Sequence, residues 1–260
     1  MRVVVRDNNS IGSMKKSKLL VGVMGAVLTI GVGAADNKVL FQNGAKLEFY
    51  DPMPENGYFG RGWGKAIFQT AQGEAIQLFA MEKIDASGGL LFSGSEDIRI
   101  SPSGRYAQIS IVRAYVGFDE WQEPLGTDRQ YCPVIDTESG CIKSNWSGAI
   151  CGGNWDAKRD VWRAGDAKAI EDDTAAMIQS MGINAEGLWK EYSRSVASGQ
   201  RSKIVDILRD FFGIQNVVAC DGLGKENVST YRSIAKQIKM EGDRESAEFL
   251  QRRIGQMANP

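Results

Sequence analysis

Residues 131–155 constrain the fold of this chain more than any other stretch. They hold three of the four cysteines and two of the six tryptophans. The sequence before them alternates apolar and polar residues as strands do, whereas the sequence after them has the periodicity of helices. We therefore expect a disulfide-stapled hairpin and hinge that joins a β-rich part to a helical part.

The amino-terminal segment has the pattern of a secretory signal peptide. Basic residues at 14–18 are followed by an apolar stretch at 19–32 and by small residues at 33–35. We predict a signal peptide over residues 1–35, with the true start at Met14, and a periplasmic or secreted mature protein. The apolar stretch is shorter than the roughly 20 residues that span a bilayer, which makes a stable membrane anchor the less favoured alternative.

Charge and length narrow the class of partner. Cleavage after Ala35 removes five basic residues and one acidic residue, so the formal net charge changes from −1 to −5. An acidic chain argues against nucleic acid or an anionic membrane as the main partner. The remaining length of about 225 residues suits one sizeable domain or two small ones.

The periodicity predicts an α+β fold. Short strands are expected at residues 46–50, 65–70, 75–84 and 106–115, and a hairpin turn is expected at 136–140. Five helices are expected, on apolar stripes that begin at Ile170, Leu188, Ile204, Tyr231 and Ala247. We thus predict an N-terminal antiparallel β-sheet domain at 36–150 and a C-terminal α-helical domain at 151–260.

Four cysteines in an exported chain predict two disulfides, although the sequence permits three pairings. We expect Cys132–Cys141 across the local turn and Cys151–Cys220 between the hinge and the helical part. Zinc is the rival interpretation. The chain has no histidine and no close C-x-x-C pair, so no metal site is expected.

The absence of histidine also excludes Ser-His-Asp and Cys-His catalysis. No cofactor is expected, because residues 222–225 match only part of a phosphate loop. Residues 233–236 match the S-x-x-K motif, but the two middle residues of this match belong to the buried stripe of a helix. A binding protein is therefore favoured over an enzyme.

Two loops are candidate binding sites. The first is rich in glycine and aromatic residues, and its candidate contacts are Tyr58, Phe59, Arg61 and Trp63. These aromatic side chains form either a recognition loop or a cap on the open end of the sheet. The second loop surrounds a tryptophan with acids, and its candidate contacts are Glu120, Trp121, Glu123 and Asp128. Acids beside an aromatic ring also suit a sugar site with a carboxylate pair.

The turn at residues 101–106 and the hairpin from Tyr131-Cys132-Pro133 to Gly140-Cys141 resemble periplasmic proteins that protect bacteria from toxins delivered by neighbouring cells. The resemblance includes the signal peptide and covers residues 100–155. It implies an inhibitor that plugs the active site of a secreted or periplasmic toxin at a fixed stoichiometry, without turnover. The alternatives are a carboxylate-dependent periplasmic hydrolase acting on cell-wall material and a structural envelope component.

Overall fold

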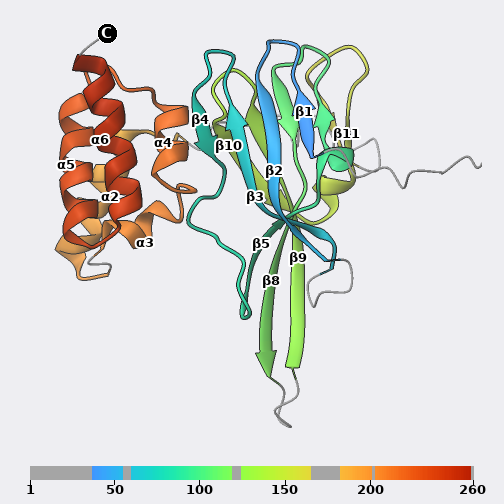
Figure 1. Cartoon of the computed structure of the whole chain (residues 1–260), viewed down its shortest axis with the longest axis horizontal. Coiled ribbons are helices and arrows are strands. Elements are labelled where there is room, and N and C mark those ends of the chain that lie inside the picture. Colours follow the sequence, from blue (N-terminus) through green and yellow to red (C-terminus); the bar gives the residue numbers. More distant parts are fainter. Residues whose placement is uncertain (1–36, 55–59, 119–123, 165–181, 201–202, 259–260) are drawn as a thin grey trace, which may run out of the picture. The chain divides into compact units, whose positions relative to one another are not determined.

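The computed structural model describes residues 37–54, 60–118, 124–164, 182–200 and 203–258. Within these ranges ten strands form one curled antiparallel sheet, a half-barrel, and a helical region follows it (Figure 1). The predicted α+β fold, with an N-terminal antiparallel sheet followed by helices, is confirmed. None of the helices in these ranges is long and apolar enough to cross a membrane.

The sheet runs in the order β1-β2-β3-β5-β8-β9-β7-β6, with β10 paired to β9 and β4 paired to β3. Its strands are β1 (Lys38–Leu40), β2 (Lys46–Met53), β3 (Gly62–Gln69), β4 (Ala75–Gln77), β5 (Gly88–Phe92), β6 (Arg99–Ile100), β7 (Tyr106–Gln108), β8 (Ile111–Phe118), β9 (Pro124–Asp136) and β10 (Ile142–Ser147). A separate pair is formed by β11 (Asn154–Trp155) and β12 (Trp162–Arg163). This pair lies beyond the domain boundary expected at residue 150.

Strand alternation follows the sequence closely in β2, where Leu47 and Phe49 are buried. The strand predicted at 75–84 is wrong beyond Gln77. Leu78 and Phe79 are adjacent, and both are buried, which a single strand facing one core does not allow. Phe79 has φ 49°, so the chain turns inward instead of continuing the strand.

The helices are α2 (Ala185–Ser198), α3 (Ile204–Leu208), α4 (Ile214–Cys220), α5 (Val228–Met240) and α6 (Arg244–Ala258). Asn184 caps α2 by accepting a hydrogen bond from the Gly187 N–H at 2.6 Å. The predicted stripe on α5 is buried throughout, from Tyr231 to Ile238. The helix expected around Ile170 lies mostly outside the described residues, and α4 was not expected at all.

Sheet and helices share one hydrophobic core. Phe79 packs edge-on against Phe212, with 5.3 Å between the ring centroids. The buried side-chain oxygen (Oδ1) of Asn216 in α4 accepts a hydrogen bond from the Ile142 N–H of β10 at 2.8 Å. These contacts pack α4 onto the sheet, and Figure 1 shows the helical hairpin α5–α6 beyond it.

The disulfides pair differently from the prediction. Cys132 bonds to Cys151, and Cys141 bonds to Cys220. The β9–β10 register sets Cys132 opposite Trp146, while the Cys141 C=O accepts a hydrogen bond from the Asp136 N–H. Cys141 therefore lies four residues along β9 from Cys132, about 13 Å away, which is too far for a disulfide. The link from sheet to helices is Cys141–Cys220, at the β9–β10 turn.

We expect Tyr231→Phe to lower the free energy of unfolding at pH 7 by about 1 kcal/mol, because the phenol donates a buried hydrogen bond to the Asp221 carbonyl. Burial raises the pKa of Tyr231 well above its ordinary value of 10.0. The tyrosine contribution is therefore complete below about pH 10 and is lost above it, where only the unfolded chain ionises. Urea unfolding should show that the free energies of unfolding of wild type and Tyr231→Phe differ at pH 7 and become similar above pH 10. A difference that stays constant with pH would contradict this assignment.

Candidate functional site

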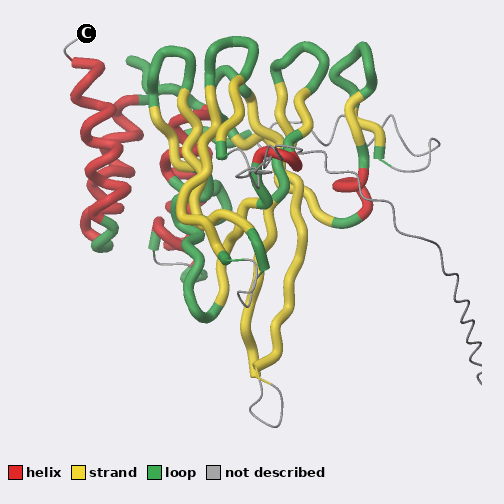
Figure 2. Tube along the Cα trace, turned by 45° about the vertical axis from the view of Figure 1, so that its right-hand side comes forward, coloured by secondary structure: helices red, strands yellow, loops and turns green. Residues whose placement is uncertain are grey.

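The most prominent surface feature is a two-stranded arm. β8 and β9 pair from Ile111 opposite Tyr131 to Phe118 opposite Pro124. The neighbouring strand β5 reaches β8 only as far as Tyr115, and β10 reaches β9 only as far as Tyr131. The outer part of the ribbon therefore projects from the sheet as an arm (Figure 1 and Figure 2).

One face of this arm carries arginine and tyrosine. Side chains on a strand alternate between faces, and the register brings one set together: Arg113, Tyr115, Arg129 and Tyr131, which we call the arm face. Tyr115 is 63% exposed, and Arg129 is also exposed. The same face continues inward to the buried Ile111, so the arm face extends the core-facing side of the sheet.

The base of the arm face is held by charge and by aromatic contacts. The Glu82 carboxylate accepts hydrogen bonds from the Arg113 guanidinium at 2.5 and 2.7 Å. The same guanidinium lies 4.5 Å from the centre of the Tyr131 ring. Its charge is therefore neutralised and its position fixed.

Arg129 behaves differently from Arg113. Its guanidinium lies 5.6 Å from the Tyr131 ring and makes no ion pair with any residue in the described ranges. Arg129 and the exposed ring of Tyr115 thus present an uncompensated positive charge next to an aromatic surface. Tyrosine and arginine are residue types that dominate protein interfaces.

Of the eight candidate binding residues predicted from the sequence, five cannot be placed in the structure. Tyr58, Phe59, Glu120, Trp121 and Glu123 lie outside the described residues.

Among the candidates that can be placed, Asp128 is exposed on the opposite face of the arm from Arg129. Arg61 is exposed and lies 3.9 Å from the carboxylate of Glu96. Trp63 is partly buried and packs on Phe49, with 6.3 Å between the ring centroids. Trp63 thus contributes to the core.

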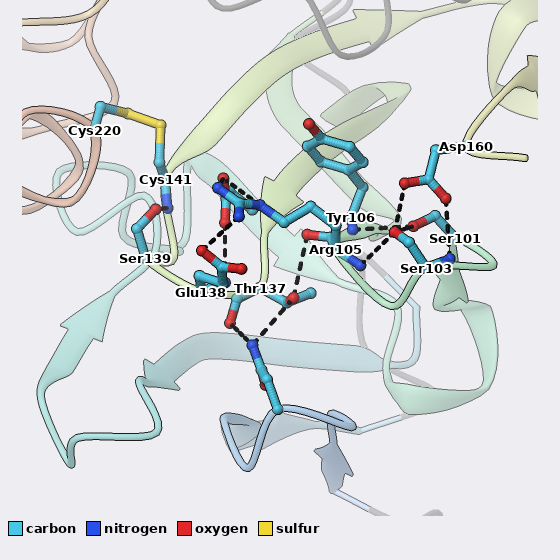
Figure 3. Close-up of polar contacts among 12 residues, drawn as sticks. Ser101, Ser103, Arg105, Tyr106, Thr137, Glu138, Ser139, Cys141, Asp160 and Cys220 are labelled. Carbon is cyan, nitrogen blue, oxygen red and sulfur yellow. Dashed lines mark hydrogen bonds and ion pairs between the residues drawn. A yellow bond between two sulfur atoms is a disulfide. The ribbon is translucent and has the colours of Figure 1, made fainter.

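Polar contacts join the turn at residues 101–106 to the β9–β10 turn (Figure 3). Arg105 donates hydrogen bonds to the Asp136 carboxylate at 2.7 and 3.1 Å, and the Thr137 hydroxyl donates to the Gly104 carbonyl at 2.7 Å. On the other side of this turn, Ser103 donates from its backbone N–H to Asp160 at 3.0 Å. These contacts hold the inner end of β9 in place and leave the buried Asp136 carboxylate compensated.

A cleft of about 220 Å³ lies between the β3–β4 turn, the β9–β10 turn, α4 and α6. It contains two carboxylates, Glu74 and Glu138. Arg253 binds Glu74 at 2.7 and 2.8 Å, and Arg105 pairs with Glu138. In the part of the chain that the structure describes, no cluster of three or more acids or cysteines is arranged to hold a metal ion.

The arm-face residues were missed from the sequence. A strand was expected only to Tyr115, and Asp128 was expected in a loop around Trp121, whereas the structure places Asp128 in β9. The alternation of arginine with tyrosine at Arg113 and Tyr115, and again at Arg129 and Tyr131, was the available signal. Comparison of the chain with protein-family models, curated proteins and solved structures finds no match.

Proposed function

We propose that this protein is an exported binding protein that neutralises a protein toxin by direct, stoichiometric binding. The observation that supports this most is the arm face, where Tyr115 and Arg129 are exposed side by side on a ribbon whose base is fixed. A strand pair that is already ordered before binding loses little backbone entropy on binding, and tyrosine and arginine are enriched among the residues that dominate binding energy. The two disulfides are compatible with an oxidising, exported location.

The alternative is a carboxylate-dependent periplasmic hydrolase acting on cell-wall material. Such an enzyme needs one carboxylic acid with a raised pKa as its general acid. Hydrogen bonds lower the pKa of three described carboxyl groups, those of Glu48, Asp85 and Asp156. A carboxyl group with a lowered pKa stays ionised near neutral pH, so these three do not suit the role of general acid.

The arm face gives a direct test. Tagged residues 36–260 are used to capture secreted proteins from the source organism and its competitors, and the captured protein is identified and assayed. Binding should be near equimolar and should abolish the activity of the captured protein. We expect Tyr115→Ala and Arg129→Ala each to weaken this binding by about tenfold or more, equivalent to about 1.4 kcal/mol.

The matched control carries the same side-chain changes elsewhere, at Tyr50 on β2 and Arg232 on α5. Tyr50 is 39% exposed, and Arg232 is exposed. Tyr50→Ala/Arg232→Ala should bind as the wild type does. Equal loss in this control and in the double variant Tyr115→Ala/Arg129→Ala would refute a role for the arm face. Turnover of a cell-wall substrate that disappears in Glu120→Ala, Glu123→Ala or Asp128→Ala would instead establish the hydrolase.

A further inference from the structure

The outer edge of β9 is open in the described structure. From Gly126 to Gln130 this strand pairs on one side with β8, whereas β10 begins its pairing at Tyr131. All five residues of this stretch are exposed. The open edge, residues 126–130, thus continues the line that β10 occupies further along the same strand.

The direction of its backbone groups follows from a single hydrogen bond. The Val116 N–H donates to the Ser87 carbonyl at 2.9 Å, so the backbone N–H and C=O groups of Val116 point away from β9. The direction of these groups alternates along an antiparallel strand. The backbone groups of Tyr115 and Gly117 therefore point towards β9 and bond to those of Thr127 and Leu125. Gly126, Asp128 and Gln130 therefore direct their N–H and C=O groups outward along the open edge.

A second copy of this chain is a poor occupant of the edge. In a two-fold antiparallel pair, directly opposed residues share a face of the sheet, so their numbers differ by an even amount. Asp128 of one copy can then never oppose Arg129 of the other. Registers centred on Asp128 or Arg129 instead set like charges directly opposite each other, which is destabilising.

We propose that the protein bound by this chain adds an extended strand to the open edge of β9, in line with β10. The added strand carries an acidic residue opposite Arg129 on the arm face and a basic residue opposite Asp128 on the other face. Main-chain hydrogen bonds to Gly126, Asp128 and Gln130 supply affinity, and the two charges select the strand. This inference rests on the proposed function, since it describes how the same arm binds its partner.

The test separates the backbone of Asp128 from its side chain. Asp128→Pro removes the outward N–H and places a ring on the open edge, without removing a hydrogen bond to β8. Asp128→Ala removes the same carboxylate but keeps the N–H. The probe is the protein captured by wild-type residues 36–260. We expect Asp128→Pro to bind it at least tenfold more weakly than Asp128→Ala does, with both variants showing wild-type circular dichroism.

Hydrogen exchange of the wild-type chain provides a measurement that does not depend on the folding of a variant. The amides of Gly126, Asp128 and Gln130 should exchange at least tenfold more slowly in the complex than in the free chain. The Thr127 and Arg129 amides, bonded to β8, should be protected in both states.

Each outcome has a defined consequence. Unchanged exchange at these three amides in the complex overturns strand addition while the binding function stands, and so does equal binding by a folded Asp128→Pro and Asp128→Ala. Failure of the wild-type chain to bind any secreted protein overturns the proposed function and this inference together.

Discussion

Replacing both Cys141 and Cys220 with alanine is expected to lower the free energy of unfolding by about 4.5 kcal/mol. This disulfide closes a loop of 79 residues, so its removal greatly increases the conformational entropy of the unfolded chain and thereby favours unfolding. It also joins the β9–β10 turn to α4, next to the hydrogen bond between Asn216 and the Ile142 N–H. Urea unfolding of the double variant and of the wild type measures the difference.

The internal control is the other disulfide. Cys132–Cys151 closes a loop of 19 residues, and the same relation gives about 3 kcal/mol for its removal. The variant without Cys141–Cys220 should therefore be the less stable of the two. The reverse order, or a loss below about 1 kcal/mol for the longer loop, would show that the unfolded chain is already compact or that native strain cancels the entropy.

The second large effect is expected at Trp162, where alanine should cost about 3–5 kcal/mol. This side chain is fully buried in a cluster with Cys132 and Val134 that is separate from the main core. Its ring packs edge-on against Trp155 at 5.2 Å, and its Nε1–H donates to the Ile150 carbonyl at 2.8 Å. Thermal or urea unfolding measures the loss.

Trp146→Ala is the matched control for Trp162→Ala. Trp146 is 44% exposed, so its truncation removes less buried apolar area and should cost clearly less than that of Trp162. Equal costs at the two tryptophans would contradict the assignment of Trp162 as the centre of this small core. A large loss at Trp162 should also raise proteolysis within residues 150–164, because the β11–β12 pair depends on that ring.

Local sequence patterns correctly predicted those elements whose conformation is set by residues near in sequence. The turn at 136–140 was predicted correctly, because Asp136, Ser139 and Gly140 favour a turn between two apolar runs. The buried stripe on α5 was also predicted correctly, since Tyr231, Ile234, Ala235 and Ile238 recur at helical spacing and share one face. In contrast, α4 is short and its N-cap, Gly213, makes no capping side-chain bond, so it has little local signal.

The candidate site was predicted only in part. Asp128 was predicted as a binding contact in a loop, whereas it is exposed on β9, where its backbone lies on the open edge. Trp63 was expected either in a recognition loop or in a cap on the open end of the sheet, and it packs on Phe49 at the core. Whether an aromatic side chain faces the core or the solvent depends on neighbours that are distant in sequence, and its own segment does not encode them.

The sequence by itself determined that this chain forms an antiparallel sheet followed by helices, because the period of apolar residues changes from two to 3.6 near the cysteine-rich stretch. Only the tertiary structure decided which cysteines pair and where, among the described residues, the edge of β9 stays open. Both depend on register, which sets Cys132 opposite Trp146 and leaves residues 126–130 beyond the reach of β10. Register is set by strand-to-strand pairing across the whole sheet, and no short segment carries that information alone.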